Sequence, residues 1–248
     1  MKVAATYNIK GGVGKTSTAV NLAYLSARQG RRTVLWDLDA QGAATYIFRV
    51  EPKVKGSRRV VRGDRPLDGA IKGTDYPGLD LIPADFTYRH MDLLLDDAKR
   101  PTRQLRRLLR QLSGDYDDVF LDCPPSMSLL SENILHAADV VLVPLIPTTL
   151  SVRTLDQLAE FVDTQPGRRP RLLGFFSMAD RRKKLHRDII EALPRQRRIA
   201  RTVIPTMAIV EQMAARREPV PHFAPRSIAA TRYRHLWAET FGNGRRGS

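Results

Sequence analysis

The segment Asn8-Ile9-Lys10-Gly11-Gly12-Val13-Gly14-Lys15-Thr16-Ser17 lies between an apolar run, residues 3–7, and a helical pattern that follows it. A strand, a glycine-rich turn and then a helix is the arrangement in which such a turn can hold phosphate groups. Its glycines let the backbone turn tightly and bring several N–H groups toward one anion. The helix that opens near Lys15 adds unpaired N–H groups and the positive end of its dipole. The segment therefore predicts a phosphate-binding loop.

The side chains of this loop suit a nucleoside triphosphate bound with Mg²⁺. We expect Lys15 to reach the β- and γ-phosphates and the Thr16 hydroxyl to ligate the metal ion. The usual pattern, G-x-x-x-x-G-K-[ST], requires a glycine where this chain has Ile9. The alternative is a glycine-rich turn without a ligand, which two lysines and a hydroxyl in this context disfavour. The predicted nucleotide contacts in the loop are Lys10, Gly11, Gly12, Val13, Gly14, Lys15, Thr16 and Ser17.

The remaining pattern, K-G-G-x-G-K-T with a second lysine at Lys10, resembles the deviant Walker A motif of the ParA/MinD family of ATPases. This resemblance implies that Lys10 reaches across a nucleotide-sandwich homodimer to the partner subunit's phosphates. It also implies ATP and Mg²⁺ as ligands, and a catalytic set of Lys10, Lys15 and Asp39.

A carboxylate-rich turn follows the predicted buried strand at residues 33–36, with the sequence Asp37-Leu38-Asp39-Ala40-Gln41-Gly42. Carboxylates at the C-terminal end of a parallel strand lie where open α/β sheets bind ligands. A solvated turn is the alternative reading. The turn is similar to the family's D-x-D-P-Q switch I motif, which implies that Asp39 positions or activates the attacking water. Ala40 stands where the family has proline, so the turn is expected to be less rigid.

A second apolar strand, residues 117–122, ends in Asp122 and is followed by Cys123-Pro124-Pro125. This is the form expected of a Walker B strand, in which Asp122 holds Mg²⁺ through a water molecule. The predicted metal-site residues are thus Thr16, Asp39 and Asp122. Residues 124–130 resemble switch II. No base accompanies Cys123, so we expect a packed small side chain rather than a nucleophile.

Strand and helix patterns alternate along the rest of the chain, which predicts an α/β fold with a right-handed, doubly wound, mostly parallel sheet flanked by helices, as in P-loop NTPases. We expect one domain over residues 1–248. Residues 50–76 lack a pattern, and are read as a basic surface excursion or a partly disordered loop. Further strands are predicted at residues 79–84, 140–145, 171–178 and 203–205, and helices around residues 105–112 and at 150–161 and 227–241.

The 248 residues carry 41 Lys and Arg against 26 Asp and Glu, a net charge of +15, which favours polyanionic partners. A single cysteine excludes an intramolecular disulfide and fits a reducing cytosol. We see no signal peptide and no run of apolar residues long enough to cross a bilayer.

Residues 168–201 hold twelve basic residues against three acidic ones, a net charge of +9. Residues 182–193 have helical periodicity, and we expect Leu185, Ile189, Ile190 and Leu193 to face inward. A solvated surface is the alternative, but the excess is larger than solubility requires. The cluster contains no stacking aromatic residue, which favours sequence-independent contact with the backbone of double-stranded DNA.

ParA-type ATPases bind DNA non-specifically as ATP dimers, through basic residues of the C-terminal half. The resemblance therefore implies a cytoplasmic, nucleoid-associated protein with a stimulating partner or cargo-adaptor protein. The cargo could be a plasmid, a chromosome or a protein assembly. It also implies that Met178 and Pro205 line the adenine base. Because the loop begins almost at residue 1, no N-terminal helix-turn-helix module is expected. The implied DNA contacts are Arg181, Arg182, Lys183, Lys184, Arg187 and Arg198.

Two other functions compete with this one. A MinD-like ATPase would use its cations on an anionic membrane and carry a C-terminal amphipathic helix. Here the last helix, with Tyr233, Leu236, Trp237 and Phe241, is expected to pack on the core, so we expect no stable membrane anchor. A metabolic ATP-dependent ligase of the same class would phosphorylate a small acid and would not need the basic cluster.

Overall fold

The computed structural model describes residues 1–192 and 198–242. Within them the strands form one eight-stranded sheet in the order β3-β4-β2-β5-β1-β6-β7-β8. The paired strands run parallel except β3, which is antiparallel to β4. The strands are β1 (Lys2–Thr6), β2 (Thr33–Asp37), β3 (Lys72–Gly73), β4 (Leu79–Ile82), β5 (Asp118–Asp122), β6 (Val140–Leu145), β7 (Arg171–Ala179) and β8 (Ile199–Pro205).

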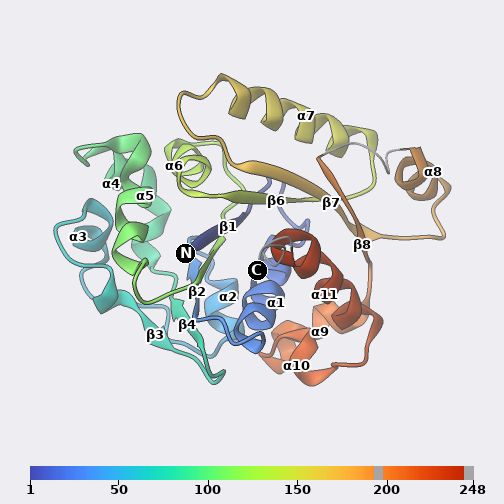
Figure 1. Cartoon of the computed structure of the whole chain (residues 1–248), viewed down its shortest axis with the longest axis horizontal. Coiled ribbons are helices and arrows are strands. Elements are labelled where there is room, and N and C mark those ends of the chain that lie inside the picture. The colour runs from blue at the N-terminus through green and yellow to red at the C-terminus, as the bar shows by residue number, and fades with distance from the viewer. Residues whose placement is uncertain (193–197, 243–248) are drawn as a thin grey trace, which may run out of the picture.

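Helices cover both faces of this sheet (Figure 1). One face is covered by α1, α2, α9, α10 and α11, and the other by α3 to α7. The α-helices are α1 (Lys15–Arg28), α2 (Ala43–Ile47), α3 (Ser57–Arg62), α4 (Met91–Asp96), α5 (Gln104–Leu109), α6 (Leu129–Ala137), α7 (Thr149–Thr164), α8 (Lys184–Ala192), α9 (Ala208–Arg216), α10 (Val220–Phe223) and α11 (Ile228–Phe241). Short 3-10 turns are η1 (Asp68–Ala70), η2 (Phe86–His90), η3 (Pro101–Arg103) and η4 (Arg110–Leu112). The predicted doubly wound α/β fold is confirmed.

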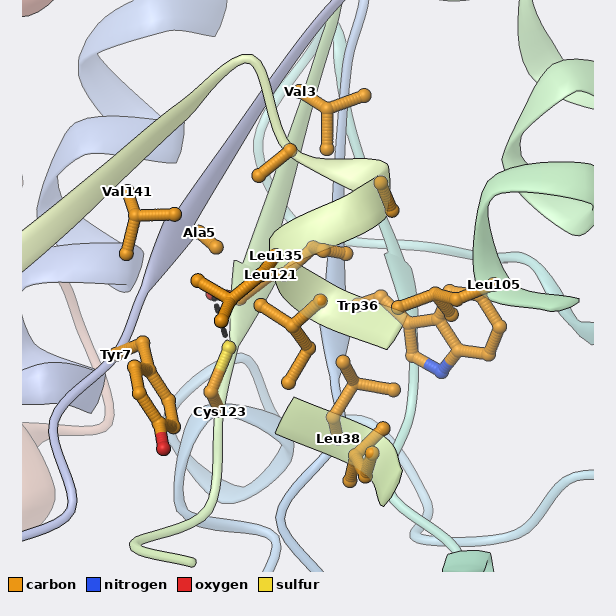
Figure 2. Packing of buried hydrophobic residues seen from close by; sticks show 14 of the residues in the cluster. Val3, Ala5, Tyr7, Trp36, Leu38, Leu105, Leu121, Cys123, Leu135 and Val141 are labelled. Carbon is orange, nitrogen blue, oxygen red and sulfur yellow. Dashed lines mark hydrogen bonds between the residues drawn. The ribbon is translucent and has the colours of Figure 1, made fainter. Parts of the chain in front are cut away.

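The strands are apolar on both sides because both faces of the sheet are buried. In β2, Val34 and Trp36 point into one hydrophobic cluster while Leu35 points into the other. Figure 2 shows the first cluster, where Trp36 and Tyr7 lie on either side of Leu121 and Cys123. Cys123 is buried, and its thiol donates to the carbonyl oxygen of Leu121, 3.5 Å away. The prediction of a packed cysteine is confirmed.

The register of the central strands brings their C-terminal ends together. Strand β5 lies between β1 and β2, with Asp122 opposite Thr6 on one side and Asp37 on the other. The Leu38 N–H then donates to the Asp122 carbonyl oxygen, 2.9 Å away, which extends the pairing by one residue. Two carboxylates therefore meet at one edge of the sheet, beside the glycine-rich loop that follows β1.

The stretch at residues 50–76 is folded, so its interpretation as a partly disordered loop was wrong. It contains α3, η1 and β3, and it buries Val54, Val60, Val61 and Leu67 in the same cluster as Trp36. Its apolar residues are too widely spaced among lysines and arginines to give a clear period. These residues fold because their apolar side chains pack against the rest of the protein, although the local sequence shows no helix or strand period.

The last helix packs on the core, as expected. Tyr233 and Leu236 are fully buried, and Trp237 and Phe241 pack against the same cluster. Ser227 caps the helix, since its side-chain oxygen accepts from the Ala230 N–H at 3.1 Å. Among the described residues, we find no helix whose length and apolar character would let it cross a membrane.

Candidate functional site

The glycine-rich loop passes directly into α1, and Gly14 is the residue at the junction. Its φ of 94° lies in the left-handed region, which favours glycine. A Cβ at this position would also come within 2.9 Å of the Ser177 side-chain oxygen at the end of β7. No side chain caps α1, and its first turn holds no acidic residue. The first N–H groups of the helix are thus left for an anion.

A cavity of about 350 Å³ opens over this loop. It joins the loop to the ends of β7 and β8, to the start of α9 and to α11. Met178, with a left-handed φ of 52°, and Pro205 both line it, as expected of base contacts. The cavity is lined by Gly11, Gly12, Gly14, Lys15, Thr16, Ser17, Asp39, Pro125, Ser177, Met178, Ile204, Pro205, Thr206, Met207, Val210, Glu211 and Tyr233.

Two predicted loop contacts lie outside the cavity lining. Val13 is buried in the protein, so it can offer only its backbone. Lys10 is half-buried beside the cavity, and its N–H donates to the Asn8 side-chain oxygen at 2.9 Å. The Lys10 side chain makes no hydrogen bond or ion pair with any described residue.

Lys15 reaches back across the loop, where its Nζ donates to the carbonyl oxygen of Lys10 at 2.8 Å. Burial lowers the pKa of Lys15, while the nearby Asp122 and Asp39 act in the opposite direction. The ammonium group is thus held at the wall of the cavity, close to two carboxylates, and partly removed from water.

Asp37 and Asp122 are both fully buried at the end of the central strands. Asp37 accepts hydrogen bonds from the Thr45 N–H and hydroxyl, at 2.8 and 2.7 Å. Burial raises the pKa of Asp37 to about 6. Asp37 is therefore not part of a solvated turn, as the alternative interpretation would have it.

Asp122 has no such partners, because neither of its carboxylate oxygens makes a hydrogen bond within the described residues. Burial raises the pKa of Asp122 well above its usual range and the neighbouring Asp37 raises it further, while the nearby Thr16 hydroxyl acts in the opposite direction. A buried polar group without a partner is rare in folded proteins and calls for a ligand, an ion or water. The Asp122 carboxylate is thus a candidate ligand for a cation.

The residues around Asp122 fit Mg²⁺. This ion keeps several waters and needs only one or two protein oxygens, with the rest supplied by phosphates. Among the described residues there is no group of three or more His, Cys, Asp and Glu that could form an all-protein metal site. The orphaned Asp122 carboxylate and the Thr16 hydroxyl at the start of α1 match the sparser set that Mg²⁺ takes with a nucleotide.

Asp39 lies at the rim of the same cavity and is half-buried. Its side-chain oxygen accepts from the Gln41 N–H at 3.0 Å, and its carbonyl oxygen accepts from the Gly42 N–H at 2.9 Å. These bonds form a tight turn although Ala40 replaces the family's proline. The other carboxylate oxygen makes no hydrogen bond with a described residue.

Two parts of the site were missed from the sequence. Asp37, the first carboxylate of the D-x-D segment, was given no role, although its position at a strand end was a signal. The far wall of the cavity comes from Thr206, Met207, Val210 and Glu211, where β8 leads into α9. No short motif marks these residues, which reach the loop only because β8 lies at the edge of the sheet.

The predicted DNA contacts on and around α8 differ in whether their side chains already bind other groups of the protein. Arg182 forms a bidentate pair with Asp180, both bonds being 3.0 Å long. Arg198 pairs with Asp163 at 3.1 Å. The Arg187 Nη1 donates to the Arg181 carbonyl oxygen at 2.7 Å. Arg181, Lys183 and Lys184 are exposed, and form no ion pair within residues 1–192 and 198–242.

The inward face predicted for α8 was partly wrong. Leu185 is 54% exposed, and the buried residue is His186, whose Nδ1 accepts from the Asp180 N–H at 3.0 Å. Ile189 and Ile190 do pack against the core. The helix begins at Lys184, later than expected, because the Asp180 turn precedes it. Leu193, Arg195 and Arg197 of the predicted cluster lie outside the described residues.

The net charge of residues 168–201 overstates the positive charge of this surface. Arg168 pairs with Asp139 at 2.7 Å. Arg169 lies 3.7 Å from Asp163, which also pairs with Arg198. Both acids come from outside the segment, so the sequence count did not include them.

Comparison with known proteins agrees with this geometry. A family model described as an AAA domain matches residues 1–169. The chain is 32% identical to the sporulation initiation inhibitor protein Soj of Bacillus subtilis, over 98% of this chain and 99% of that protein. It is 36% identical to the chromosome-partitioning ATPase Soj of Thermus thermophilus, over 95% and 93%.

A solved structure also resembles the whole chain. The cobyrinic acid a,c-diamide synthase from Mycobacterium smegmatis, with bound ADP and magnesium, has a TM-score of 0.77 at 30% identity, covering 98% of this chain and 96% of that one. The similarity in sequence and in fold thus extends over nearly the whole chain. The chain belongs to the ParA/MinD family of P-loop ATPases.

Proposed function

We propose that this protein is a ParA-like partition or positioning ATPase, built as a single domain. It binds ATP with Mg²⁺, pairs with a second copy, holds double-stranded DNA without regard to sequence, and hydrolyses ATP to release it. The observation that carries the proposal is the orphaned, fully buried Asp122 carboxylate beneath an uncapped glycine-rich loop with two lysines.

The loop residues hold the triphosphate. The N–H groups of Gly12, Gly14 and the first turn of α1 surround the phosphates, and Lys15 leaves the Lys10 carbonyl oxygen to reach them. Thr16 and Asp122 would hold the magnesium ion. When bound, Mg²⁺ neutralises charge that develops on the phosphate oxygens.

Asp39 orients the water that attacks the terminal phosphate. Its place at the cavity rim, with one oxygen fixed by Gln41, supports this role. Met178 and Pro205 lie on the opposite wall, where they contact the adenine base.

The surroundings of Lys10 support a homodimer. Its side chain has no partner within the described residues, and it stands beside apolar residues that face solvent. Ile9 is 36% exposed and Met127 is 64% exposed. A second copy placed over this face buries both residues, and brings Lys10 to its partner's phosphates.

Non-specific DNA binding is supported by the net charge of +15 and by the exposed Arg181, Lys183 and Lys184. Phosphate contacts of this kind are individually weak. Dimerisation joins two such surfaces, so affinity rises by avidity without any new contact. ATP binding and hydrolysis thus switch the protein on and off DNA, in response to a stimulating partner or cargo-adaptor protein.

The oligomeric state with and without ATP tests this proposal. We would measure the mass of the protein in solution with ATP and Mg²⁺, with ADP, and without nucleotide, together with its affinity for a fluorescent duplex. A dimer that forms only with ATP and binds DNA more tightly is the expected result. Lys10→Ala should stay monomeric while still binding ATP, and Lys53→Ala, an exposed lysine elsewhere, should behave as the wild type. A wild-type monomer at saturating ATP would contradict the proposal.

The likeness to the amide synthase structure favours one second candidate, an ATP-dependent ligase acting on a small carboxylic acid. Such an enzyme would hydrolyse ATP only with its acid substrate and would ignore DNA. Stimulation of ATPase activity by DNA and a partner protein, in the absence of any small acid, distinguishes the proposed function from this one.

A further inference from the structure

A second basic surface lies far from α8. Residues 99–114 contain six cations and no acidic residue: Lys99, Arg100, Arg103, Arg106, Arg107 and Arg110. They belong to η3, α5, η4 and the loop before them. Figure 1 places α3, α4 and α5 at the β3–β4 end of the sheet, and α8 at the β7–β8 end. The two basic surfaces are thus separated by the whole width of the sheet.

Four of these arginines form a stripe along one side of the helical segment. Arg103, Arg106, Arg107 and Arg110 are spaced by three, one and three residues, the spacing of a single helix face. We call them the α5 arginine stripe. The leucines of the segment face the other way and are buried: Leu105, Leu108, Leu109 and Leu112.

The charge of this stripe is not balanced by acidic side chains. None of its four arginines forms an ion pair within the described residues. The one hydrogen bond that their guanidinium groups make with a described residue is from Arg107 Nη2 to the Arg62 carbonyl oxygen, at 3.1 Å. Arg182, just before α8, and Arg198, just before β8, are by contrast paired with Asp180 and Asp163.

The like charges are unfavourable for the helix itself. Arginines four residues apart repel, as Arg103 and Arg107 do, so helix stability does not account for the stripe. The positive charge of the stripe also acts on the neighbouring His136. Burial lowers the pKa of His136, and Arg103 and Arg106 lower it further. A compensating negative charge from outside the chain would relieve this repulsion.

The shape of the surface suits an extended polyanion. The stripe runs for roughly 10 Å along the helix. Beside it, Arg62, Lys99 and Arg107 line a shallow groove of about 460 Å³, together with Asp64 and Asp97. Each strand of B-form DNA places a phosphate about every 3.4 Å along the axis, so the stripe spans about three of them.

Other polyanions fit less well. A membrane-binding helix needs an exposed apolar face, whereas the leucines of this segment are buried and none of the large exposed apolar residues lies between positions 99 and 112. Single-stranded nucleic acid calls for stacking aromatic residues, and residues 99–114 contain none.

We propose that the α5 arginine stripe is a second contact surface for the phosphate backbone of duplex DNA. Because it lies at the opposite end of the sheet from α8, one subunit can touch two segments of duplex. This inference rests on the proposed function for the identity of its ligand, but it requires neither ATP nor a dimer.

The test compares variants that lose the same net charge, either from the stripe or from other parts of the surface. The first variant combines Arg103→Gln, Arg107→Gln and Arg110→Gln, the three exposed members of the stripe. The control combines Arg28→Gln, Arg153→Gln and Arg226→Gln, exposed arginines scattered over α1, α7 and the loop before α11. A third variant replaces the same three stripe residues by lysine. Affinity for a fluorescent duplex is measured without nucleotide at NaCl concentrations from about 50 to 200 mM.

For the stripe variant we expect weaker binding and a plot of log affinity against log salt that is shallower by about 2 to 3, since each lost phosphate contact removes about 0.9. The control and the lysine variant should keep the wild-type slope. The control and the lysine variant should keep the wild-type melting temperature, the stripe variant should melt at the same or a higher temperature because the repulsion is relieved, and all three should keep the wild-type ATP affinity. Equal slopes for the stripe variant and the control would overturn the inference. Binding to anionic vesicles is measured for the same variants, and a stripe variant that loses vesicle binding but keeps DNA binding would also overturn it. A wild-type protein that fails to dimerise with ATP refutes the proposed switch, yet leaves this comparison of slopes valid.

Discussion

Lys15 donates from Nζ to the backbone carbonyl oxygen of Lys10, 2.8 Å away, so the side chain predicted to hold phosphate closes the loop on itself. The bond fixes the lysine over the loop, near the space where phosphate is expected. It also joins the two lysines of the motif. If Lys15 leaves this oxygen to bind phosphate, as proposed, the loop around Lys10 loses that contact, and its conformation then depends on whether the site is occupied.

Lys15→Ala should reduce ATP affinity by at least about a hundredfold, because the lost ion-phosphate contacts are charge-assisted and partly buried. Titration with a fluorescent ATP analogue measures this. Lys10→Ala is the matched control, since it removes the other lysine but should leave the monomer's ATP affinity within a few fold of the wild type. Unchanged binding by Lys15→Ala would refute the phosphate-loop assignment.

Asp122→Asn should make the nucleotide-free protein more stable, because a neutral amide is less costly to bury than a carboxylate without partners. We expect the free energy of unfolding at neutral pH to rise by about 1 to 2 kcal/mol. Chemical denaturation without nucleotide measures it.

The same variant should lose the stabilisation that ATP with Mg²⁺ gives the wild type beyond ATP alone. Ser113→Ala, a surface change far from the site, serves as the control and should change neither quantity. A destabilised Asp122→Asn protein that still responds to Mg²⁺ would show that the buried carboxylate has a structural partner instead of a metal.

The sequence was sufficient for the sheet and for the glycine-rich loop that passes into α1, because both depend on local signals. The apolar runs at β1, β5 and β6 are continuous since helices cover both faces, and the loop needs glycines at fixed spacing. The order of the strands, which places Asp37 beside Asp122, is a property of the whole fold. So is the wall formed by Met207 and Glu211.

The sequence did not show which basic residues are paired with acidic residues in the folded protein. Within residues 168–201 three acids stand against the cations, but Asp139 and Asp163 join them from distant positions. In residues 99–114 the count is smaller, yet none of the four stripe arginines forms an ion pair within the described residues, although Asp64 and Asp97 share a groove with Arg107. Pairing in space depends on tertiary contacts, and linear counts do not record these.

Asp39→Ala should lower ATP hydrolysis by about a hundredfold or more while leaving ATP affinity nearly unchanged, as expected for a residue that orients water. ATP-bound protein should then accumulate as a dimer on DNA. Release of inorganic phosphate and dissociation from a duplex measure the two effects. Glu51→Ala, an exposed acid further along the same connection, is the control. Hydrolysis at the wild-type rate would remove Asp39 from the mechanism.

Arginines on and around α8 should contribute to DNA binding according to whether they are already paired. The variant Arg181→Gln with Lys184→Gln should lower the salt dependence of DNA binding by about 2, one phosphate contact for each residue. Arg182→Gln with Arg198→Gln changes the net charge equally, but these guanidiniums already bind Asp180 and Asp163. Each must leave a carboxylate to reach a phosphate, so we expect little change in slope. Both variants should bind ATP as the wild type does. If both variants lower the slope of log affinity against log salt equally, net charge, and not direct contact, controls DNA binding at this surface.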